Sequence, residues 1–318
     1  MRLPVPAPPP GSRPFDAVGM GLNAVDHLIV VERFPAFNSK SEILSHATLP
    51  GGQAATAMVA LSRLGLRTRH VGRVGSDETG ALQLASLDAE GVERSECRVV
   101  EGAESQIAFI VVEAGSGERT ILWRRDHRAS ILVDEVDEEI SCSGRVLHLD
   151  GHNVEAEIAA ATWARAAGIP VSIDVDFDYG GERLYPLVDY FIPSADFPAQ
   201  MTGVADERTA LAALRERFGC PLVAMTLGAR GALALCDGTY VESPGFRVDA
   251  RDTTGAGDAF HAGFLYGLLT GLDLEASLRV ANAVAALNCT RLGARGGLPT
   301  RAELDDFLAT ATTARTSP

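Results

Sequence analysis

The chain has 318 residues, enough for one large or two ordinary domains. Its composition, 46% hydrophobic and 22% charged, is typical of a soluble globular protein. A formal net charge of -14 argues against nucleic acid and anionic membranes as partners, because both favour a basic surface.

The basic residues are almost all arginine, and Lys40 is the single lysine. A phosphate-binding loop of the GxxxxGK[ST] type is therefore excluded, since its lysine is missing. The five cysteines are scattered and lack C-x-x-C spacing, which indicates reduced thiols in the cytoplasm. The seven histidines show no metal-ligand spacing, so we assign them to packing or solvent. No apolar run reaches the roughly 18 residues of a membrane helix.

The chain begins with MRLPVPAPPPGSRP, which has five prolines before Gly11 and no apolar segment of the kind found in signal peptides. Proline-rich ends of this kind are commonly disordered. We therefore expect a disordered, proline-rich tail over residues 1–14 and a single domain over residues 15–312.

Strand-like and helix-like segments then alternate along the chain. Strands are predicted at 16–21, 68–74, 145–149, 170–175, 190–192 and 222–227, and helices at 53–64, 79–90, 155–167 and 207–218. This order predicts an α/β fold with a doubly wound, mostly parallel sheet and helices on both of its faces.

Four further strand-like segments have no helices of their own, at 27–32, 42–48, 107–112 and 119–123. The last two flank Ala114-Gly115-Ser116-Gly117, which is a hairpin signal. We expect two insertions, at about 26–48 and 105–125, to meet in space and form a small β lid. An unpaired edge of this lid is where a homodimer would form.

The segment Asp252–Phe260, with the sequence DTTGAGDAF, follows an extended stretch and opens a helix. Gly255 and Gly257 allow backbone N–H groups to turn inward, and a helix N-terminus adds its dipole, so the segment can form an anion hole. Asp258, on the first turn, would be a proton acceptor beside that hole, which suits phosphoryl transfer. The alternative is a glycine turn in which the aspartate only caps the helix.

This segment resembles the C-terminal signature of the ribokinase-like, or PfkB, carbohydrate kinases. The resemblance implies that Asp258 is the catalytic base and that Gly255, Ala256 and Gly257 supply the anion hole. Gly51-Gly52-Gln53-Ala54-Ala55-Thr56 resembles the N-terminal signature of the same family, and the likeness covers residues of about 15–310. The family usually has asparagine where this chain has Thr56, and this difference concerns the identity of the sugar.

The resemblance also implies an acceptor site around Asp26, which follows the first strand. A carboxylate there accepts hydrogen bonds from two adjacent sugar hydroxyls. The other substrate-binding residues that we expect are Asn23, Gly51, Gly52, Gln53 and Thr56. Lys40 and Arg124 of the lid join them if they point inward, and the substrate would then carry an anionic group. Similarity around 52–57 and 289–297 to ketohexose and sulfofructose kinases favours a ketose or its derivative.

For the nucleotide, the resemblance implies an ATP site, for which we expect Thr226, Gly228, Gly231, Asn282 and Gly293. It also implies K⁺ bound by backbone carbonyls at Asp252 and Thr254. Mg²⁺ is required on chemical grounds, because it neutralises the ATP phosphates. The NxxE motif of the family corresponds to Ser194-Ala195-Asp196-Phe197 here, so its glutamate is missing and the protein ligands of Mg²⁺ are not assigned.

The expected activity is ATP-dependent phosphorylation of a hydroxyl of a small, sugar-like molecule. One alternative is a nucleoside kinase of the same fold, with Phe109 or Trp123 stacking on the base. A second is a non-catalytic sugar sensor, which would be expected to lose Asp258. A third is an NAD-dependent oxidoreductase, suggested by Gly19-Met20-Gly21 and Ala24. That motif should open a helix, but the sequence that follows Asp26 favours a strand.

Overall fold

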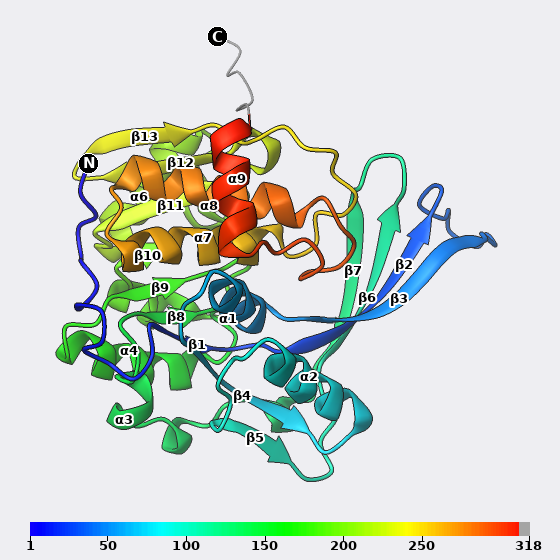
Figure 1. The fold of residues 1–318 in the computed structure, drawn as a ribbon, viewed down its shortest axis with the longest axis horizontal. Coiled ribbons are helices and arrows are strands. Elements are labelled where there is room, and N and C mark those ends of the chain that lie inside the picture. The colour runs from blue at the N-terminus through cyan, green and yellow to red at the C-terminus, as the bar shows by residue number, and fades with distance from the viewer. Residues whose placement is uncertain (312–318) are drawn as a thin grey trace.

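The structure is a computed structural model that describes residues 1–311. The predicted end of the domain, residue 312, lies just outside the described residues. Within them, the body of the protein is one large sheet with helices on both faces, and a smaller sheet projects from it (Figure 1). Both parts of the predicted fold, the doubly wound α/β sheet and the β lid, are confirmed.

The large sheet has the strand order β13-β12-β11-β10-β9-β8-β1-β4-β5. Its neighbours pair in parallel, except that β11–β12 and β12–β13 are antiparallel. Its strands are β1 (Ala17–Met20), β4 (Thr68–Gly75), β5 (Cys97–Val100), β8 (Leu147–Leu149), β9 (Val171–Ile173), β10 (Tyr190–Phe191), β11 (Leu222–Thr226), β12 (Ala232–Cys236) and β13 (Thr239–Ser243).

Helices cover both faces of this sheet. The helices of residues 1–311 are α1 (Gln53–Arg63), α2 (Glu78–Ala89), α3 (Glu138–Ser141), α4 (Val154–Ala166), α5 (Phe197–Thr202), α6 (Glu207–Phe218), α7 (Ala256–Thr270), α8 (Leu274–Asn288) and α9 (Arg301–Thr310). Helices α1, α7 and α8 share one buried cluster with the sheet, and α4 and α6 share the other. None of these helices has both the length and the apolar character that crossing a lipid bilayer requires.

The strands bury side chains on both faces, because successive residues of a strand point in opposite directions. Along β11, Leu222 and Ala224 belong to the cluster with α1, α7 and α8, whereas Val223 and Met225 belong to the cluster with α4 and α6. This is why the segment is continuously apolar in the sequence rather than alternating. The parallel strands point their carboxyl ends to one edge of the sheet, where loops can bring polar side chains together.

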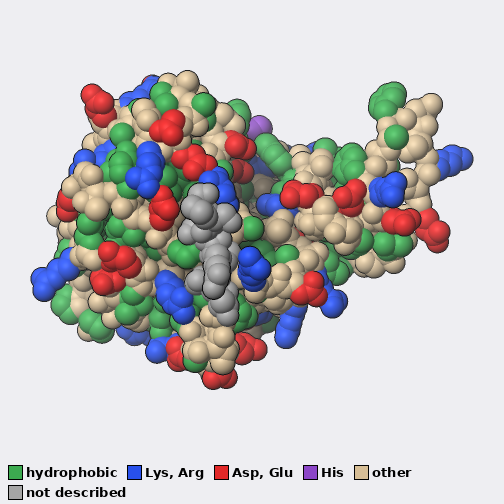
Figure 2. All heavy atoms as spheres, turned by 90° about the horizontal axis from the view of Figure 1, so that it is seen from above, with side chains coloured by type: hydrophobic (Ala, Val, Ile, Leu, Met, Phe, Trp, Pro, Cys, Tyr) green, Lys and Arg blue, Asp and Glu red, His purple; other side chains and the backbone are tan. Residues whose placement is uncertain are grey.

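The lid is a four-stranded sheet in the order β3-β2-β6-β7. It consists of β2 (Ala24–Val31), β3 (Ile43–Gly51), β6 (Ile107–Glu113) and β7 (Arg119–Arg124). Strands β2 and β6 come from the two separate insertions and pair in parallel, which joins the insertions as expected. Figure 2 shows the lid as an arm that projects from the side of the body.

The antiparallel edge of the large sheet was not predicted. Strands β12 and β13 form a hairpin whose turn is Asp237-Gly238, with φ of 48° and 74°. An Asp-Gly pair between short apolar runs is a strong signal for a two-residue hairpin, because both positions require positive φ. The sequence therefore carried the signal for this hairpin.

The first 14 residues correct our expectation of a disordered tail. Met1, Leu3, Val5 and Ala7 are partly buried against the main hydrophobic cluster. The Tyr190 hydroxyl hydrogen-bonds both the N–H and the carbonyl of Val5. Figure 1 shows the segment running down the side of the body. The prolines fix an extended chain, and its alternate apolar side chains dock on the body.

We predict that deletion of residues 1–8 lowers the melting temperature by roughly 4–8 °C, because it removes partly buried apolar surface and several hydrogen bonds worth about 1 kcal/mol each. Differential scanning calorimetry of the full and shortened chains measures this shift. An unchanged melting temperature would show that the segment contributes nothing to stability and would favour the disordered tail.

Candidate active site

The start of α7 forms the cradle predicted from the sequence. Gly255 is the N-cap residue with φ of 72°, and a Cβ there would lie 2.4 Å from the carbonyl oxygen of Ala294, so only glycine fits. A Cβ at Gly257 would meet no atom within 4 Å, which means that this position faces open space. Phe260, Phe264 and Leu268 anchor α7 in the core and fix the direction of its first turn.

Three backbone amides at this turn are available to a ligand. Ala256 N donates to Thr253 O at 3.2 Å and Ala259 N donates to Gly255 O at 2.9 Å. The amides of Gly255, Gly257 and Asp258 donate none of the hydrogen bonds found among residues 1–311. Unpaired amides at a helix N-terminus, reinforced by the helix dipole, form a site for an anion such as a phosphoryl group.

Asp258 lies in this first turn and is only 9% exposed. Its carboxylate accepts no hydrogen bond within the described part of the chain. Burial raises the pKa of Asp258 well above its usual value, and the nearby carboxylates Asp174 and Asp26 raise it further, against the opposing effect of Arg295 and Arg119. A buried, unpaired carboxylate with a raised pKa is suited to take a proton from a hydroxyl.

Asp26 lies on β2, at the root of the lid, and is 5% exposed. A Cβ at Gly51 would lie 2.2 Å from its Oδ2, so glycine at the end of β3 makes room for this carboxylate. Burial raises the pKa of Asp26 to about 6, while Arg295 lowers it and Asp252 raises it. Asp26 raises the pKa of Asp258, which brings the predicted acceptor residue and the predicted base into one site.

We did not expect Arg295 to be a site residue, although it lies in the segment 289–297 that contributes to the family resemblance. It belongs to the loop between α8 and α9 and is 4% exposed. Its Nε donates to Thr56 Oγ1 at 3.1 Å, and its Nη2 donates to Gly51 O at 2.5 Å and to Asn23 Oδ1 at 3.2 Å. Threonine at position 56 is shorter than the asparagine usual in the signature, and the arginine side chain occupies the adjoining space.

Gln53 is placed at the acceptor end of the site by α1, whose first residue it is. Its Oε1 lies 2.7 Å from His152 Nε2, and the His152 ring packs on Tyr179 with centroids 4.3 Å apart. Asp150, 1% exposed at the end of β8, accepts from Leu22 N at 2.6 Å. His152 and Asp150 therefore line the acceptor side of the site together with Gln53, and we call these three residues the acceptor wall. The spacing of the histidines in the sequence gave no indication of this role.

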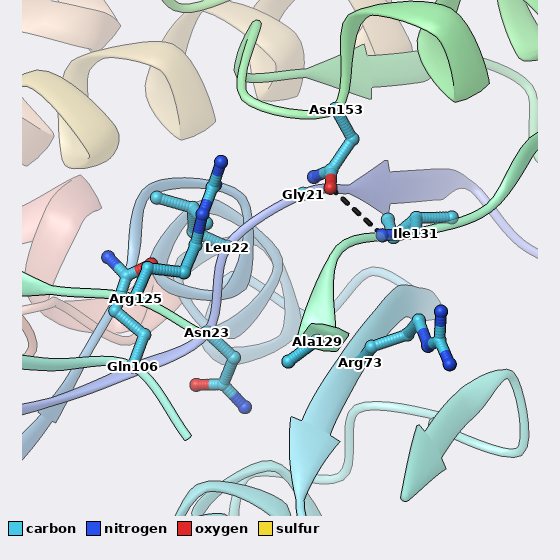
Figure 3. A pocket seen from close by; sticks show the side chains of 9 residues that line it. All are labelled: Gly21, Leu22, Asn23, Arg73, Gln106, Arg125, Ala129, Ile131 and Asn153. Carbon is cyan, nitrogen blue, oxygen red and sulfur yellow. Dashed lines mark hydrogen bonds between the residues drawn. The ribbon is translucent and has the colours of Figure 1, made fainter. Parts of the chain in front are cut away.

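A small cavity lies beside this wall, and two arginines reach it. Figure 3 shows Arg125 and Arg73 on opposite sides of the cavity, with Asn23 also lining it. Arg125 Nη2 donates to His152 O at 3.2 Å, and Arg73 Nη1 donates to Ser130 O at 2.8 Å. Arg73 Nη1 also lies 3.6 Å from the Glu135 carboxylate, with which it forms an ion pair. The Nε atoms of both arginines are buried, and neither has a hydrogen-bond partner in residues 1–311.

The two basic lid residues that we expected at the acceptor lie elsewhere. Lys40 is exposed in the loop between β2 and β3, at the outer part of the lid. Arg124 is 71% exposed and pairs with Glu104 at 2.5 Å. The structure brings Arg125 to the cavity instead, because neighbouring residues at the end of a strand point in opposite directions.

The predicted nucleotide residues lie at the carboxyl ends of β11 and β13. Thr226 ends β11, Gly228 opens the short 3-10 turn that follows, and Gly231 ends that turn. Asn282 on α8 is 6% exposed and donates from Nδ2 to Ser243 O at 3.0 Å, so it fixes the end of β13. These residues form one side of the same edge of the sheet, next to the amides of α7.

Asp252, predicted at a K⁺ site, joins the loops around the cradle. Its carboxylate accepts from Thr254 N at 2.9 Å and from Gly293 N at 2.7 Å, which ties the loop before α7 to the loop after α8. Asn288 Nδ2 donates to Thr254 O at 3.2 Å. The lid reaches the same loop, because Arg119 Nη1 donates to Thr253 Oγ1 at 2.7 Å.

Two further groups lie near the base. Asp174, 7% exposed after β9, lies 3.2 Å from His261 Nε2, and His261 is one turn beyond Asp258 on α7. Asp196, at the position of the NxxE motif, is exposed. The described residues contain no cluster of three or more His, Cys, Asp or Glu side chains that could hold a metal ion.

The comparison with known proteins bears on this site. The model of the pfkB family carbohydrate kinases matches residues 17–301. The chain is 33% identical to the ATP-dependent ribose-1-phosphate kinase of Halopiger xanaduensis, over 89% of this chain and 94% of that protein. It is 30% identical to the ribokinase of Haemophilus influenzae, over 91% and 97%. It is also 30% identical to probable fructokinase-3 of Arabidopsis thaliana, over 85% and 86%.

Among solved structures, a putative ribokinase from Agrobacterium tumefaciens superposes with a TM-score of 0.87 at 29% identity, over 93% of this chain and 97% of that one. The relatives include ribose and fructose kinases alike, so the expected specific likeness to ketohexose and sulfofructose kinases is not supported. The chain nevertheless belongs to the pfkB family of carbohydrate kinases, which are phosphotransferases with an alcohol group as acceptor.

Proposed function

We propose that the acceptor of this ATP-dependent sugar kinase is a ribose-type sugar that already carries a phosphate group. The observation that carries this proposal is Arg125, which lines the cavity and whose buried Nε atom has no partner among residues 1–311. Arg73 lines the same cavity, but its guanidinium is paired with Glu135. Arginine binds phosphate through its planar fork of donors. The name of the Halopiger xanaduensis relative, a ribose-1-phosphate kinase, supports the same choice. The cavity has the size of about one water molecule, so phosphate binding requires these side chains to shift.

In the reaction that we propose, Asp258 takes the proton of the attacking hydroxyl. The amides of Gly255, Gly257 and Asp258 then hold the negative charge of the transferring phosphoryl group, as the helix dipole also does. Ala256 N is committed to Thr253 O, so this amide, which we had expected to contribute, is already used. Asp26 orients the acceptor by accepting hydrogen bonds from neighbouring hydroxyls.

Cations complete this proposal. Mg²⁺ supplies charge neutralisation of the ATP phosphates, and we expect it to be held mainly by phosphate and water, with Asp174 and Asp258 near it. K⁺ stays a prediction for the backbone carbonyls of Asp252 and Thr254, of which Thr254 O already accepts from Asn288. A homodimer through the lid also stays a proposal, for which the exposed Leu44 and Leu122 are available.

A nucleoside acceptor is the second candidate, and one observation bears on it. Trp123 pairs with Ala108, and Ala108 pairs with Asp26, so these three side chains lie on one face of the lid. Trp123 is 56% exposed and free to stack on a ring above the acceptor site. Phe109 pairs with His27 and faces the other way, so it is the weaker of the two expected stacking residues.

We predict that Asp258→Asn lowers kcat by a factor on the order of 10²–10⁴, because the amide cannot accept the proton. The same change should raise the melting temperature by roughly 2–4 °C, because it removes a buried charge that lies near Asp174 and Asp26. Steady-state kinetics and calorimetry measure the two effects. Asp189→Asn is the control: this remote carboxylate is also buried but pairs with Arg165, so its loss should lower stability and leave kcat unchanged. Full activity of Asp258→Asn would exclude the proposed base.

The pH dependence should reflect Asp26. Its raised pKa, about 6, means that the carboxylate becomes protonated as the pH falls through about 6 and can then accept fewer hydroxyl hydrogen bonds. We expect kcat/KM for the acceptor to decline below about pH 6. Since the folded state binds this proton more tightly than the unfolded chain, Asp26 also lowers stability as the pH rises from about 4 to 6. Asp26→Asn should abolish that loss of stability, and thermal melts across this pH range test it.

The substrate is tested by a panel of ribose-1-phosphate, ribose, fructose and adenosine in a coupled ADP-release assay. We expect the highest kcat/KM for ribose-1-phosphate and a loss of roughly tenfold or more for it in Arg125→Gln, with little change for ribose. Arg128→Gln is the control, because Arg128 is exposed and paired with Asp126. A preference for fructose or adenosine in the unmodified protein, or equal losses for ribose and its phosphate in Arg125→Gln, would contradict the proposal.

A further inference from the structure

We propose that Arg295 is a positioning residue of the acceptor site, which holds Gly51 and Asn23 in place and supplies the counter-charge that keeps Asp26 ionised. The inference depends on the acceptor site described above, but not on which sugar binds there. Arg295 is contributed by the loop between α8 and α9, far along the chain from every residue of the acceptor wall.

The guanidinium of Arg295 joins four parts of the fold. Its hydrogen bonds reach Thr56 on α1, Ser86 on α2, Asn23 between β1 and β2, and Gly51 at the end of β3. The residue is 4% exposed, so these contacts are shielded from water. Because Gly51 also leaves the space for the Asp26 carboxylate, the position of its backbone determines where Asp26 can lie.

The partners of this guanidinium are all neutral. Arg295 makes no salt bridge within residues 1–311, and its four acceptors are two hydroxyls, an amide oxygen and a carbonyl oxygen. A buried charge is costly unless other charges compensate it. The anions that act on Arg295 are Asp26, Asp258 and Glu90, of which the first two belong to the site. Arg295 is therefore a cation that acts on two carboxylates of the site, Asp26 and Asp258, without forming a direct ion pair with either.

The loop that carries Arg295 is itself fixed. Arg63, the last residue of α1, donates from Nη1 to Arg295 O at 3.1 Å and to Leu298 O at 3.0 Å. Arg63 also pairs with Glu90, the residue that ends α2, at 2.5 Å. A guanidinium held at both its backbone and its side chain has little freedom to move when a ligand binds, as a positioning residue requires.

The charge of Arg295 acts on Asp26 against burial and the carboxylate of Asp252. Arg295 lowers the pKa of Asp26, while Asp252 raises it, and Asp26 in turn raises the pKa of Asp258. With a neutral residue at position 295, Asp26 would face Asp252 without a counter-charge. The pKa of Asp26 would then rise above the value of about 6 found here. The loss of acceptor binding at low pH, which we call the acid limb, would begin at a higher pH.

The experiment compares Arg295→Gln and Arg295→Lys with Arg145→Gln. Arg145 is the control, since it is also 4% exposed and bonds backbone carbonyls. It differs in its ion pair with Asp16, and it lies at the opposite end of the strands. We expect Arg295→Gln to raise the acceptor KM roughly tenfold or more, with the ATP KM within about twofold. Its acid limb of kcat/KM should move to higher pH. Arg295→Lys should restore the acid limb and not the KM, and Arg145→Gln should lower the melting temperature only.

Thr56→Val provides a second test that does not remove the charge. It deletes the Nε partner while preserving side-chain volume, so the acceptor KM should rise by roughly threefold to tenfold with no shift of the acid limb. Equal effects of Arg295→Gln on both substrates, an unmoved acid limb, or a Thr56→Val protein with unchanged acceptor KM would each overturn the proposal. The measurements use whichever sugar of the panel has the highest kcat/KM, so a wrong substrate assignment leaves this test intact.

Discussion

The placement of like charges among buried side chains is the constraint on which the site depends. Asp258 and Asp26 are both nearly buried, and Asp26 and Asp174 both raise the pKa of Asp258. Such a group is unfavourable unless positive charge balances it. The structure supplies that balance from a helix N-terminus with free amides and from one buried arginine, Arg295. Repulsion between these carboxylates therefore destabilises the folded state at the candidate active site, and we expect bound substrate and cations to relieve it.

The architecture explains why these groups meet. In the large sheet, β1 lies between β4, which is the next strand of this sheet in the chain, and β8, which comes much later. The later strands are therefore added on both sides of β1. Crevices in open α/β sheets form at such points, at the carboxyl ends of the strands. Asp26 follows β1, Asp150 follows β8 and Asp174 follows β9, so these three carboxylates all lie at that edge. The lid begins at the same place, because β2 follows β1 and carries Asp26.

The sequence predicted the parts of the site that are local and failed where the site depends on distant contacts. The turn before Asp258 and the glycine pair before α1 are short motifs whose geometry follows from the residues themselves. Arg295 bonds Thr56 across 239 positions of the chain, and no local pattern identifies that contact. Arg124 and Arg125 are equivalent in a sequence reading, and only the direction of the strand end decides that Arg125 reaches the cavity.

The lid and the cradle are mechanically joined even without ligand, and this shapes how the site closes. Arg119 of β7 bonds Thr253, directly before the cradle. Leu49 of β3 lies against Gly293, where even a Cβ would come within 2.4 Å of it, and Gly293 is tied to the cradle through Asp252. A displacement of β3 or β7 would therefore act on the loops that flank the unpaired amides of α7 as well as on Asp26. Under the function proposed above, acceptor and nucleotide contact one connected set of loops, so we expect binding of one to favour binding of the other.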